Sequence, residues 1–191
     1  MKIGLFFGSF NPVHNGHLML ANYMVQTTDL NKVWFVVSPH NPLKDKKTLL
    51  GEYDRLNLIN LAIENNPKLK ASDIEFKLPQ PSYTIDTLSY LKDKFPKHEF
   101  TLIMGSDNLT TLHKWKNYQQ LIEQYPIIVY QRRGFTKNPF PEVKTIQHID
   151  FPFIDISSTF IREQIKKGIS VRYFMPDVVW QYIEEMKFYK K

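Results

Sequence analysis

The sequence predicts an α/β fold in which a doubly wound parallel sheet carries helices on both faces. Two observations support this fold class. Short apolar runs of strand length recur along the 191 residues, and segments with apolar side chains at helical spacing separate them. Strands buried on both faces have continuous apolar sequences, and parallel strands need a crossover between them, which a helix supplies. We expect residues 1–191 to form a single domain with a small C-terminal helical part.

The strands are expected where apolar and β-branched residues run together, as in VWFVV at residues 33–37. Residues 135–150 are polar and contain two prolines, and we interpret them as a connection without an assigned function. The pattern predicts five strands, at residues 2–7, 31–37, 69–76, 100–105 and 126–130.

The helices are expected where apolar residues recur every three or four positions. In the second helix Arg55 lies off the apolar stripe, so a solvated side chain is expected there. The arrangement is Rossmann-like, and ligands of such sheets bind beyond the carboxyl ends of the strands, where the strand order reverses. If the first strand and the strand ending at Gly105 adjoin there, the polar groups after them face one crevice. The helices are predicted at residues 18–25, 51–65, 84–94, 157–168 and 176–187.

Composition and charge narrow the classes of function. Apolar residues make up 42% of the chain and charged residues 23%, as in an ordinary globular protein. The chain has no cysteine, which excludes a disulfide framework and leads us to expect a cytoplasmic protein. No apolar stretch reaches the roughly 20 residues of a membrane span, so no membrane partner is expected. The net charge is +6, but the lysines and arginines are dispersed along the chain and form no aromatic-basic repeat. This pattern favours phosphorylated small molecules over nucleic acid as the partner.

The turn after the first strand has the sequence GSFNPVHNGH at residues 8–17. Gly8 is expected to take a backbone geometry closed to other residues, and Gly16 lets a ligand approach the backbone where the helix begins. His14 and His17 are three residues apart, so both imidazoles lie on one face of the first helical turn. Because free amides at a helix N-terminus attract anions, the turn suits a polyphosphate. A capping or solvated histidine is the ordinary interpretation of either residue alone, and a zinc site is a weaker alternative.

Three further segments place polar groups at strand ends or helix starts. Residues 38–47 form a polar loop after the second strand, where we place Lys44 against phosphate. Asp107 follows the strand that ends at Gly105, a position where aspartate commonly caps the next helix. Arg162 lies one turn inside a helix that starts with hydroxyl residues, so its guanidinium can form a two-pronged contact with phosphate oxygens.

Together these segments resemble a known family. The opening pattern Gly-x-Phe-x-Pro-x-His-x-Gly-His after an N-terminal strand is similar to that of the nucleotidylyltransferase superfamily. Its members join a nucleoside triphosphate to a phosphorylated acceptor. Three later segments resemble bacterial nicotinate-nucleotide adenylyltransferase in order and spacing, over nearly the whole chain: PSYT at residues 81–84, IMGSD at 103–107 with Trp115, and ISSTFIR at 156–162.

The resemblance implies an enzyme that makes nicotinic acid adenine dinucleotide and pyrophosphate from ATP and nicotinate mononucleotide, as a step toward NAD. It implies Mg²⁺ bound through the ATP phosphates, with no metal ligand from protein side chains. By motif, the catalytic residues would be His14, His17, Lys44 and Arg162. The ATP-binding residues would be Gly8, Ser9, Phe10, His14, His17, Gly105, Ser158, Thr159 and Arg162. The residues at the nicotinate nucleotide would be Thr84, Asp107, Trp115 and Arg133.

The chain also departs from the family pattern. Phe7 and Asn11 stand where Gly and Asp are common, and we expect phosphate binding to be unaffected. Lys116 follows Trp115 where many members have a second aromatic residue, which bears on how the pyridine ring stacks. The alternatives are an adenylyltransferase for another phosphorylated acceptor, such as nicotinamide mononucleotide or phosphopantetheine, or a nucleotide-binding module without catalysis. The sequence is compatible with a homo-oligomer and does not determine the oligomeric state.

Overall fold

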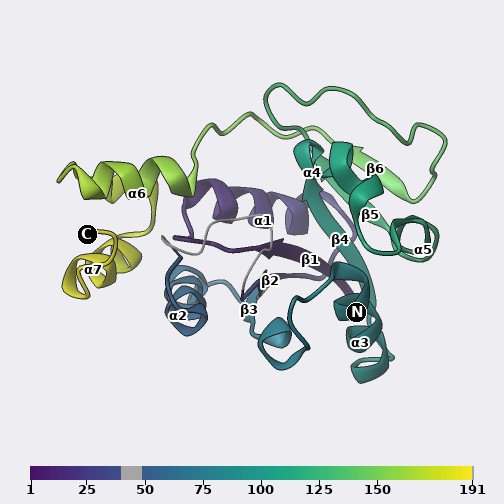
Figure 1. The fold of residues 1–191 in the computed structure, drawn as a ribbon, viewed down its shortest axis with the longest axis horizontal. Coiled ribbons are helices and arrows are strands. Elements are labelled where there is room, and N and C mark those ends of the chain that lie inside the picture. The colour runs from purple at the N-terminus through teal and green to yellow at the C-terminus, as the bar shows by residue number, and fades with distance from the viewer. Residues whose placement is uncertain (40–48, 191) are drawn as a thin grey trace.

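A six-stranded parallel sheet forms the centre of the molecule (Figure 1). The computed structural model describes residues 1–39 and 49–190. The strand order is β3-β2-β1-β4-β5-β6, and each neighbouring pair runs parallel, which confirms the predicted doubly wound sheet. The strands are β1 (Lys2–Gly8), β2 (Lys32–Val37), β3 (Leu69–Ser72), β4 (Glu99–Gly105), β5 (Ile127–Tyr130) and β6 (Ile146–Ile149).

Helices connect the strands from β1 to β5, and two more follow the sheet at one end of the molecule, α6 and α7 (Figure 1). Within the described ranges, no helix has the length and apolar character needed to cross a membrane. The 3₁₀ turns are η2 (Ile74–Lys77), η3 (Leu112–Lys114) and η4 (Arg172–Phe174). The α-helices are α1 (Asn15–Thr27), α2 (Glu52–Ile63), α3 (Thr84–Lys94), α4 (Ser106–Thr111), α5 (Tyr118–Gln124), α6 (Ser158–Lys166) and α7 (Asp177–Glu185).

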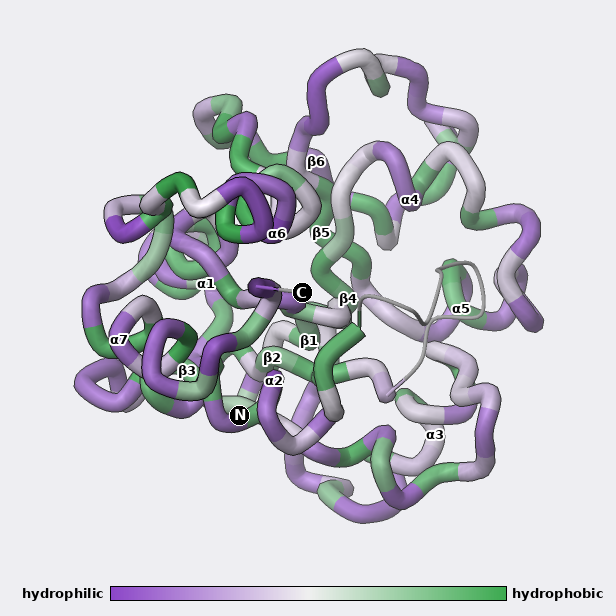
Figure 2. The backbone as a smooth tube through the Cα atoms, turned by 60° about the vertical axis from the view of Figure 1, so that its left-hand side comes forward, coloured by the Kyte–Doolittle hydropathy of each residue, from purple (hydrophilic) through white to green (hydrophobic). Residues whose placement is uncertain are grey.

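Apolar side chains build one core on each face of the sheet. On β1, Ile3 and Leu5 belong to one core and Phe6 to the other, because successive side chains of a strand point to opposite faces. Helices α1, α2, α6 and α7 contribute to the core around Phe6, whereas α3, α4 and α5 contribute to the other. Figure 2 shows β4 and β5 as largely hydrophobic segments inside this arrangement. The C-terminal helices therefore share a core with α1 and α2.

Several segments differ from the predicted elements, among them α4 and α5, for which no helix range was predicted. Strand β3 ends at Ser72, and the 3₁₀ turn η2 replaces the rest of the strand expected over residues 69–76. The connection at residues 135–150 contains the strand β6, which the sequence pattern did not reveal. The two isoleucines of β6 are half-buried and its two central residues are exposed. A short strand with a neighbour on one side only carries a weak apolar signal.

The strand order reverses between β1 and β4, which lie side by side in the sheet. The chain leaves β1 for α1 on one face and leaves β4 for α4 on the other. A cavity lies beyond the carboxyl ends of these strands and is lined by residues that follow both of them. This confirms that the strand ending at Gly105 adjoins the first strand.

Arg55 ties together the loops at this edge, and the expectation of a solvated side chain is wrong. The residue is fully buried, at 0% exposure. Arg55 shares the buried face of α2 with Leu58 and Ile59, three and four positions later, so it does not face away from the apolar stripe as predicted. The loops after β1 and β2 cover it with main-chain carbonyl groups. The guanidinium donates four hydrogen bonds of 2.7 to 3.0 Å, to the carbonyl oxygens of Ser9, Ser38, Pro39 and Leu50.

Candidate active site

His14 and His17 stand side by side where α1 begins. His14 precedes the first helical turn, with extended backbone angles of φ −146° and ψ 169°. Nδ1 of His17 accepts a hydrogen bond of 3.3 Å from the main-chain N–H of His14, and the two rings stack with centroids 3.7 Å apart. Because Nδ1 is an acceptor, a neutral His17 carries its proton on Nε2, which is then a donor. The structure thus brings the two imidazoles together as their spacing predicted.

His14 is held in the neutral form by its surroundings. The residue is only 4% exposed. Burial, together with the nearby positive charge of Arg132, lowers the pKa of His14 to about 4. Its Nδ1 atom has no hydrogen-bond partner in the part of the chain that the structure describes. Buried polar atoms without a partner are rare in folded proteins, and together with the lowered pKa this marks His14 as a candidate functional residue.

The turn between β1 and α1 is shaped by close packing around Phe10. Phe10 has a left-handed backbone, with φ 45°, and its buried ring packs against Phe6, His17 and Phe35. A Cβ atom on Gly8 would lie 2.8 Å from that ring, so glycine is required there for space. The expectation of an unusual backbone geometry at Gly8 is wrong, because the left-handed residue of this turn is Phe10.

The N-terminus of α6 contacts the same turn. The Ser157 hydroxyl caps the helix by accepting a main-chain N–H bond of 3.2 Å. Ser158 Oγ donates a bond of 2.9 Å to the carbonyl oxygen of Pro12, and Arg162 Nη1 donates one of 2.8 Å to that of Asn11. Two helix N-termini and a guanidinium therefore converge on one turn, which is an arrangement suited to phosphate.

The ends of β4 and β5 supply an ion pair across the crevice. Asp107 lies inside the first turn of α4 and is not its cap, because the capping position is Gly105. Oδ2 of Asp107 lies 3.9 Å from Nε of Arg132, and the main-chain N–H of Arg132 donates a bond of 2.8 Å to Ser106 Oγ. A side chain at Gly105 would collide with the Asp107 carboxylate, so this glycine lies behind the pair.

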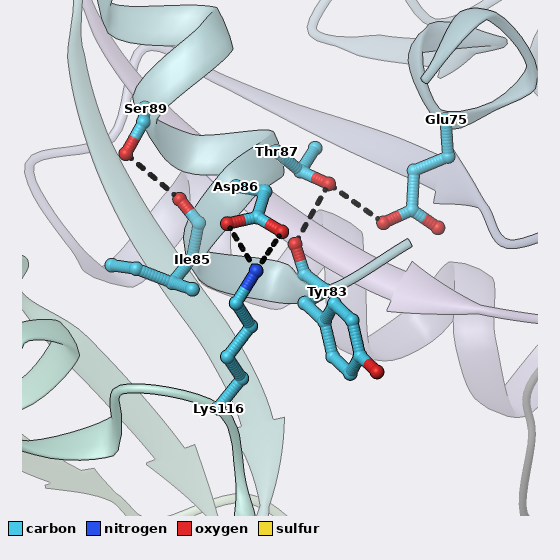
Figure 3. Close-up of polar contacts among 7 residues, drawn as sticks. All are labelled: Glu75, Tyr83, Ile85, Asp86, Thr87, Ser89 and Lys116. Atoms are coloured by element: carbon cyan, nitrogen blue, oxygen red, sulfur yellow. Dashed lines mark hydrogen bonds and ion pairs between the residues drawn. The ribbon is translucent and has the colours of Figure 1, made fainter. Parts of the chain in front are cut away.

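Figure 3 shows Lys116 reaching across to the first turn of α3. Its Nζ lies 2.8 and 3.1 Å from the two carboxylate oxygens of Asp86 and 4.8 Å from the ring centroid of Tyr83. Thr87 Oγ1 donates a bond of 2.9 Å to the carboxylate of Glu75. Burial raises the pKa of Glu75, although hydroxyl donors act in the opposite direction. These contacts fix the start of α3 from two sides.

Two adjoining cavities join these parts of the site. The larger has a volume of about 890 Å³ and extends along the turn after β1, the start of α3 and the first turns of α6. The smaller has a volume of about 500 Å³ and shares the histidine pair, Asp107 and Arg132 with the larger. Aromatic and aliphatic side chains dominate the rest of the smaller cavity, among them Phe6, Leu20, Tyr130, Phe151 and Phe153.

Most of the predicted site residues line the larger cavity. Arg133 instead lines the smaller cavity, with its side chain 83% exposed and 3.3 Å from Asp155. The structure therefore does not bring Arg133 together with Thr84 and Trp115. Lys44 lies outside the described residues. The predicted residues that share the larger cavity are Gly8, Ser9, Phe10, His14, His17, Thr84, Asp107, Trp115, Ser158, Thr159 and Arg162.

Sequence reasoning missed several residues of the site. Arg132 lines both cavities, and its signal was its place directly after a core strand, the same signal that pointed to Asp107. Residues 151–156 line the smaller cavity, and their signal was an apolar run inside a connection. Glu75 had no local signal, because a single carboxylate beside a strand usually faces solvent.

The donor set suits phosphate oxygens better than a cation held by the protein. No group of three or more His, Asp or Glu side chains able to hold a metal ion is found among residues 1–39 and 49–190. Imidazole N–H groups, a guanidinium and helix amides are donors, and they bind anions. A hard cation such as Mg²⁺ keeps waters and binds phosphates directly, which fits a site that presents donors to those phosphates.

The fold and this site define a class of nucleotidyltransferases. The chain matches the family model described as cytidylyltransferase-like over residues 5–164. A curated relative from Flavobacterium psychrophilum, named probable nicotinate-nucleotide adenylyltransferase, is 56% identical over 193 residues that cover 100% of both chains. A relative of the same name from Flavobacterium johnsoniae is 54% identical, again over 100% of both chains. The chain therefore belongs to the nicotinate-nucleotide adenylyltransferase family, as its motifs suggested.

Solved structures have the same fold. The structure of Plasmodium falciparum nicotinic acid mononucleotide adenylyltransferase complexed with NaAD has a TM-score of 0.82 at 20% identity, covering 98% of this chain and 97% of that one. A putative nicotinate-nucleotide adenylyltransferase from Vibrio parahaemolyticus has a TM-score of 0.74 at 18% identity, covering 100% of this chain and 96% of that one. At these identities the likeness establishes the fold.

Proposed function

We propose that the protein transfers the adenylyl group of ATP to nicotinate mononucleotide, a step of NAD biosynthesis that yields nicotinic acid adenine dinucleotide and pyrophosphate. One observation carries the proposal: the cavity that contains the histidine pair and Arg162 also contains the start of α3 and Trp115. The names of the full-length relatives support this acceptor. The core shared by α1, α2, α6 and α7 supports a single domain over residues 1–191.

The turn after β1 and the start of α6 would hold the triphosphate. Helix amides and the Thr159 hydroxyl offer donors to phosphate oxygens, while the Ser158 hydroxyl, which donates to the Pro12 carbonyl oxygen, ties α6 to the turn. Arg162 can contact two phosphate oxygens through its planar guanidinium, and it already lines the cavity. His14 and His17 would donate hydrogen bonds to oxygens of the α-phosphate.

The smaller cavity suits the adenine base. Its volume of about 500 Å³ and its aromatic lining fit a planar, mostly apolar group. The cavity shares the histidine pair with the larger one, so a base bound there would leave the α-phosphate beside the imidazoles. The base and the phosphates would then occupy the two cavities.

The start of α3 and Trp115 would hold nicotinate mononucleotide. The indole ring of Trp115 can stack on the pyridine ring. The amides that begin at Thr84 favour a carboxylate over a neutral amide, because a helix N-terminus carries partial positive charge. Asp86 lies in the same first turn of α3, and its carboxylate pairs with Lys116 at 2.8 Å. Lys116 thereby offsets the negative charge of Asp86 near an anionic acceptor.

The reaction would be a direct displacement at the α-phosphorus of ATP. A phosphate oxygen of the acceptor bonds to the α-phosphorus while the bond to the bridging oxygen breaks, and that electron pair leaves with pyrophosphate. His14 and His17 stabilise the growing charge, Arg162 holds the departing phosphates, and Lys44 is predicted to do the same. Mg²⁺ bound through the ATP phosphates would neutralise part of their charge. The protein need not supply a nucleophile.

Pyrophosphate release, measured with ATP and a panel of acceptors, tests this function. We expect nicotinate mononucleotide to exceed nicotinamide mononucleotide by at least about 10-fold in kcat/KM, because the amide would leave buried donors unpaired. Equal values for the two would mean that the pocket accepts both. If pyrophosphate were released only with phosphopantetheine, that compound would be the acceptor in place of nicotinate mononucleotide. If the protein bound ATP but released no pyrophosphate with any acceptor, it would be a nucleotide-binding module.

A further inference from the structure

The C-terminal segment returns to the turn after β1. Lys187 and Tyr189 have left-handed backbones, with φ 54° and 64°. Such conformations are costly for residues other than glycine and persist where surrounding contacts hold them. Here the main-chain N–H of Phe188 donates a bond of 3.0 Å to the carbonyl oxygen of Ile183. The hydroxyl of Tyr189 donates a bond of 2.9 Å to Oδ1 of Asn11, 178 positions earlier in the chain.

Asn11 joins three separate parts of the protein. Its Oδ1 atom accepts the Tyr189 hydroxyl and also the main-chain N–H of Leu50, at 3.2 Å. Its carbonyl oxygen accepts Nη1 of Arg162 at 2.8 Å. Asn11 is only 4% exposed, and it lines the larger cavity. The position of Asn11 therefore affects both the turn and the guanidinium that faces phosphate.

The Tyr189 hydroxyl is a persistent donor. Burial raises the pKa of Tyr189 well above its ordinary value, although the positive charges of Arg162 and Arg55 act in the opposite direction. The hydroxyl therefore keeps its proton at neutral pH. Both arginines also contact the turn after β1, Arg55 at Ser9 and Arg162 at Asn11.

We infer that Tyr189 is a positioning residue of the nucleotide site, which holds Asn11 and thereby the Arg162 guanidinium in place for the triphosphate. Tyr189 is not among the residues that line the two cavities, so it acts through Asn11 and not by contact with the nucleotide. The inference rests on the proposed function only in taking ATP as the ligand of the larger cavity. It does not depend on which acceptor is used.

Tyr189→Phe tests this role because it removes the hydroxyl and keeps the ring. We expect ATP binding, measured by calorimetry without acceptor, to weaken by about 3- to 10-fold, as for one lost hydrogen bond. The KM for the acceptor should stay within about twofold, since Asn11 contacts the triphosphate side of the cavity. Tyr182→Phe is the matched control, because it removes a hydroxyl from α7 while its ring still packs on Phe188, 6.0 Å away. The control should bind ATP as the parent does.

Unchanged ATP binding in Tyr189→Phe would overturn the inference. So would a fall in melting temperature accompanied by equal losses toward ATP and acceptor, since that pattern marks a general structural role. Asn11→Ala supplies a second comparison. If Tyr189 acts through Asn11, the double variant should bind ATP no more weakly than Asn11→Ala alone, whereas additive losses would contradict that route. A parent protein that binds ATP but releases no pyrophosphate would instead count against the proposed function.

Discussion

Replacing Arg55 by leucine is expected to destabilise the protein by about 3 to 5 kcal/mol. The guanidinium is fully buried and donates to four main-chain carbonyl oxygens. Each buried acceptor left without a donor costs about 1 to 3 kcal/mol. The summed cost of the four acceptors is reduced for two reasons. The leucine variant no longer buries a charge, and water can enter the vacated space and donate hydrogen bonds to some of the carbonyl oxygens. Since whole domains are stable by only about 5 to 15 kcal/mol, this one change removes a large share of the stability.

Urea denaturation followed by circular dichroism measures the loss, and Arg172→Leu is a matched control. Arg172 also makes two short bonds, 2.8 and 3.1 Å to the Asp177 carboxylate, but both side chains are about half exposed. Exposed ion pairs contribute little to stability because water screens them, so the control should unfold almost as the parent does. For a chain of 191 residues the Arg55 variant should melt about 6 to 20 °C lower. A loss below about 1 kcal/mol would refute the reasoning, since solvent would then be satisfying all four carbonyl groups.

Three further predictions concern the histidine pair and Arg162. His17→Ala should lower turnover by about 10²- to 10³-fold with a smaller effect on acceptor KM, and near-normal turnover with only a raised KM would argue against its role at the α-phosphate. Arg162→Lys should weaken ATP binding measurably, because an ammonium cannot form a two-pronged contact; equal binding would place Arg162 outside the phosphate contacts. The pKa of His14 is lowered from 6.5 to about 4 in the folded protein, so below about pH 6.5 the unfolded chain binds the extra proton. Stability from this group is therefore full above about pH 6.5 and falls by about 3 kcal/mol as the pH drops toward 4, and His14→Asn should remove that part of the pH dependence in urea titrations.

Local patterns were enough to predict several of the elements that carry the site. The apolar run of β1, the turn at residues 8–17 and the helix after it follow from neighbouring residues, since strand and helix periodicity are properties of short segments. The same holds for α6, whose hydroxyl-rich start and Arg162 lie within one helical turn. The sequence argument took the pairing of β1 with β4 only as a condition for a shared crevice, and the structure fulfils that condition.

Tertiary structure alone decided the contacts between residues far apart in the chain. Arg55 carries a charge that ordinarily faces solvent, and its burial depends on carbonyl groups from separate loops that meet only in the folded protein. The lowered pKa of His14 comes first from burial and then from the charge of Arg132, and both arise only when the strand ends meet. Arg162 and Tyr189, near the other end of the chain, both contact Asn11. Periodicity determines which residues form a helix or strand and which face is apolar. It carries no information on which polar groups will meet when those faces pack, because that depends on the order and crossing of the strands.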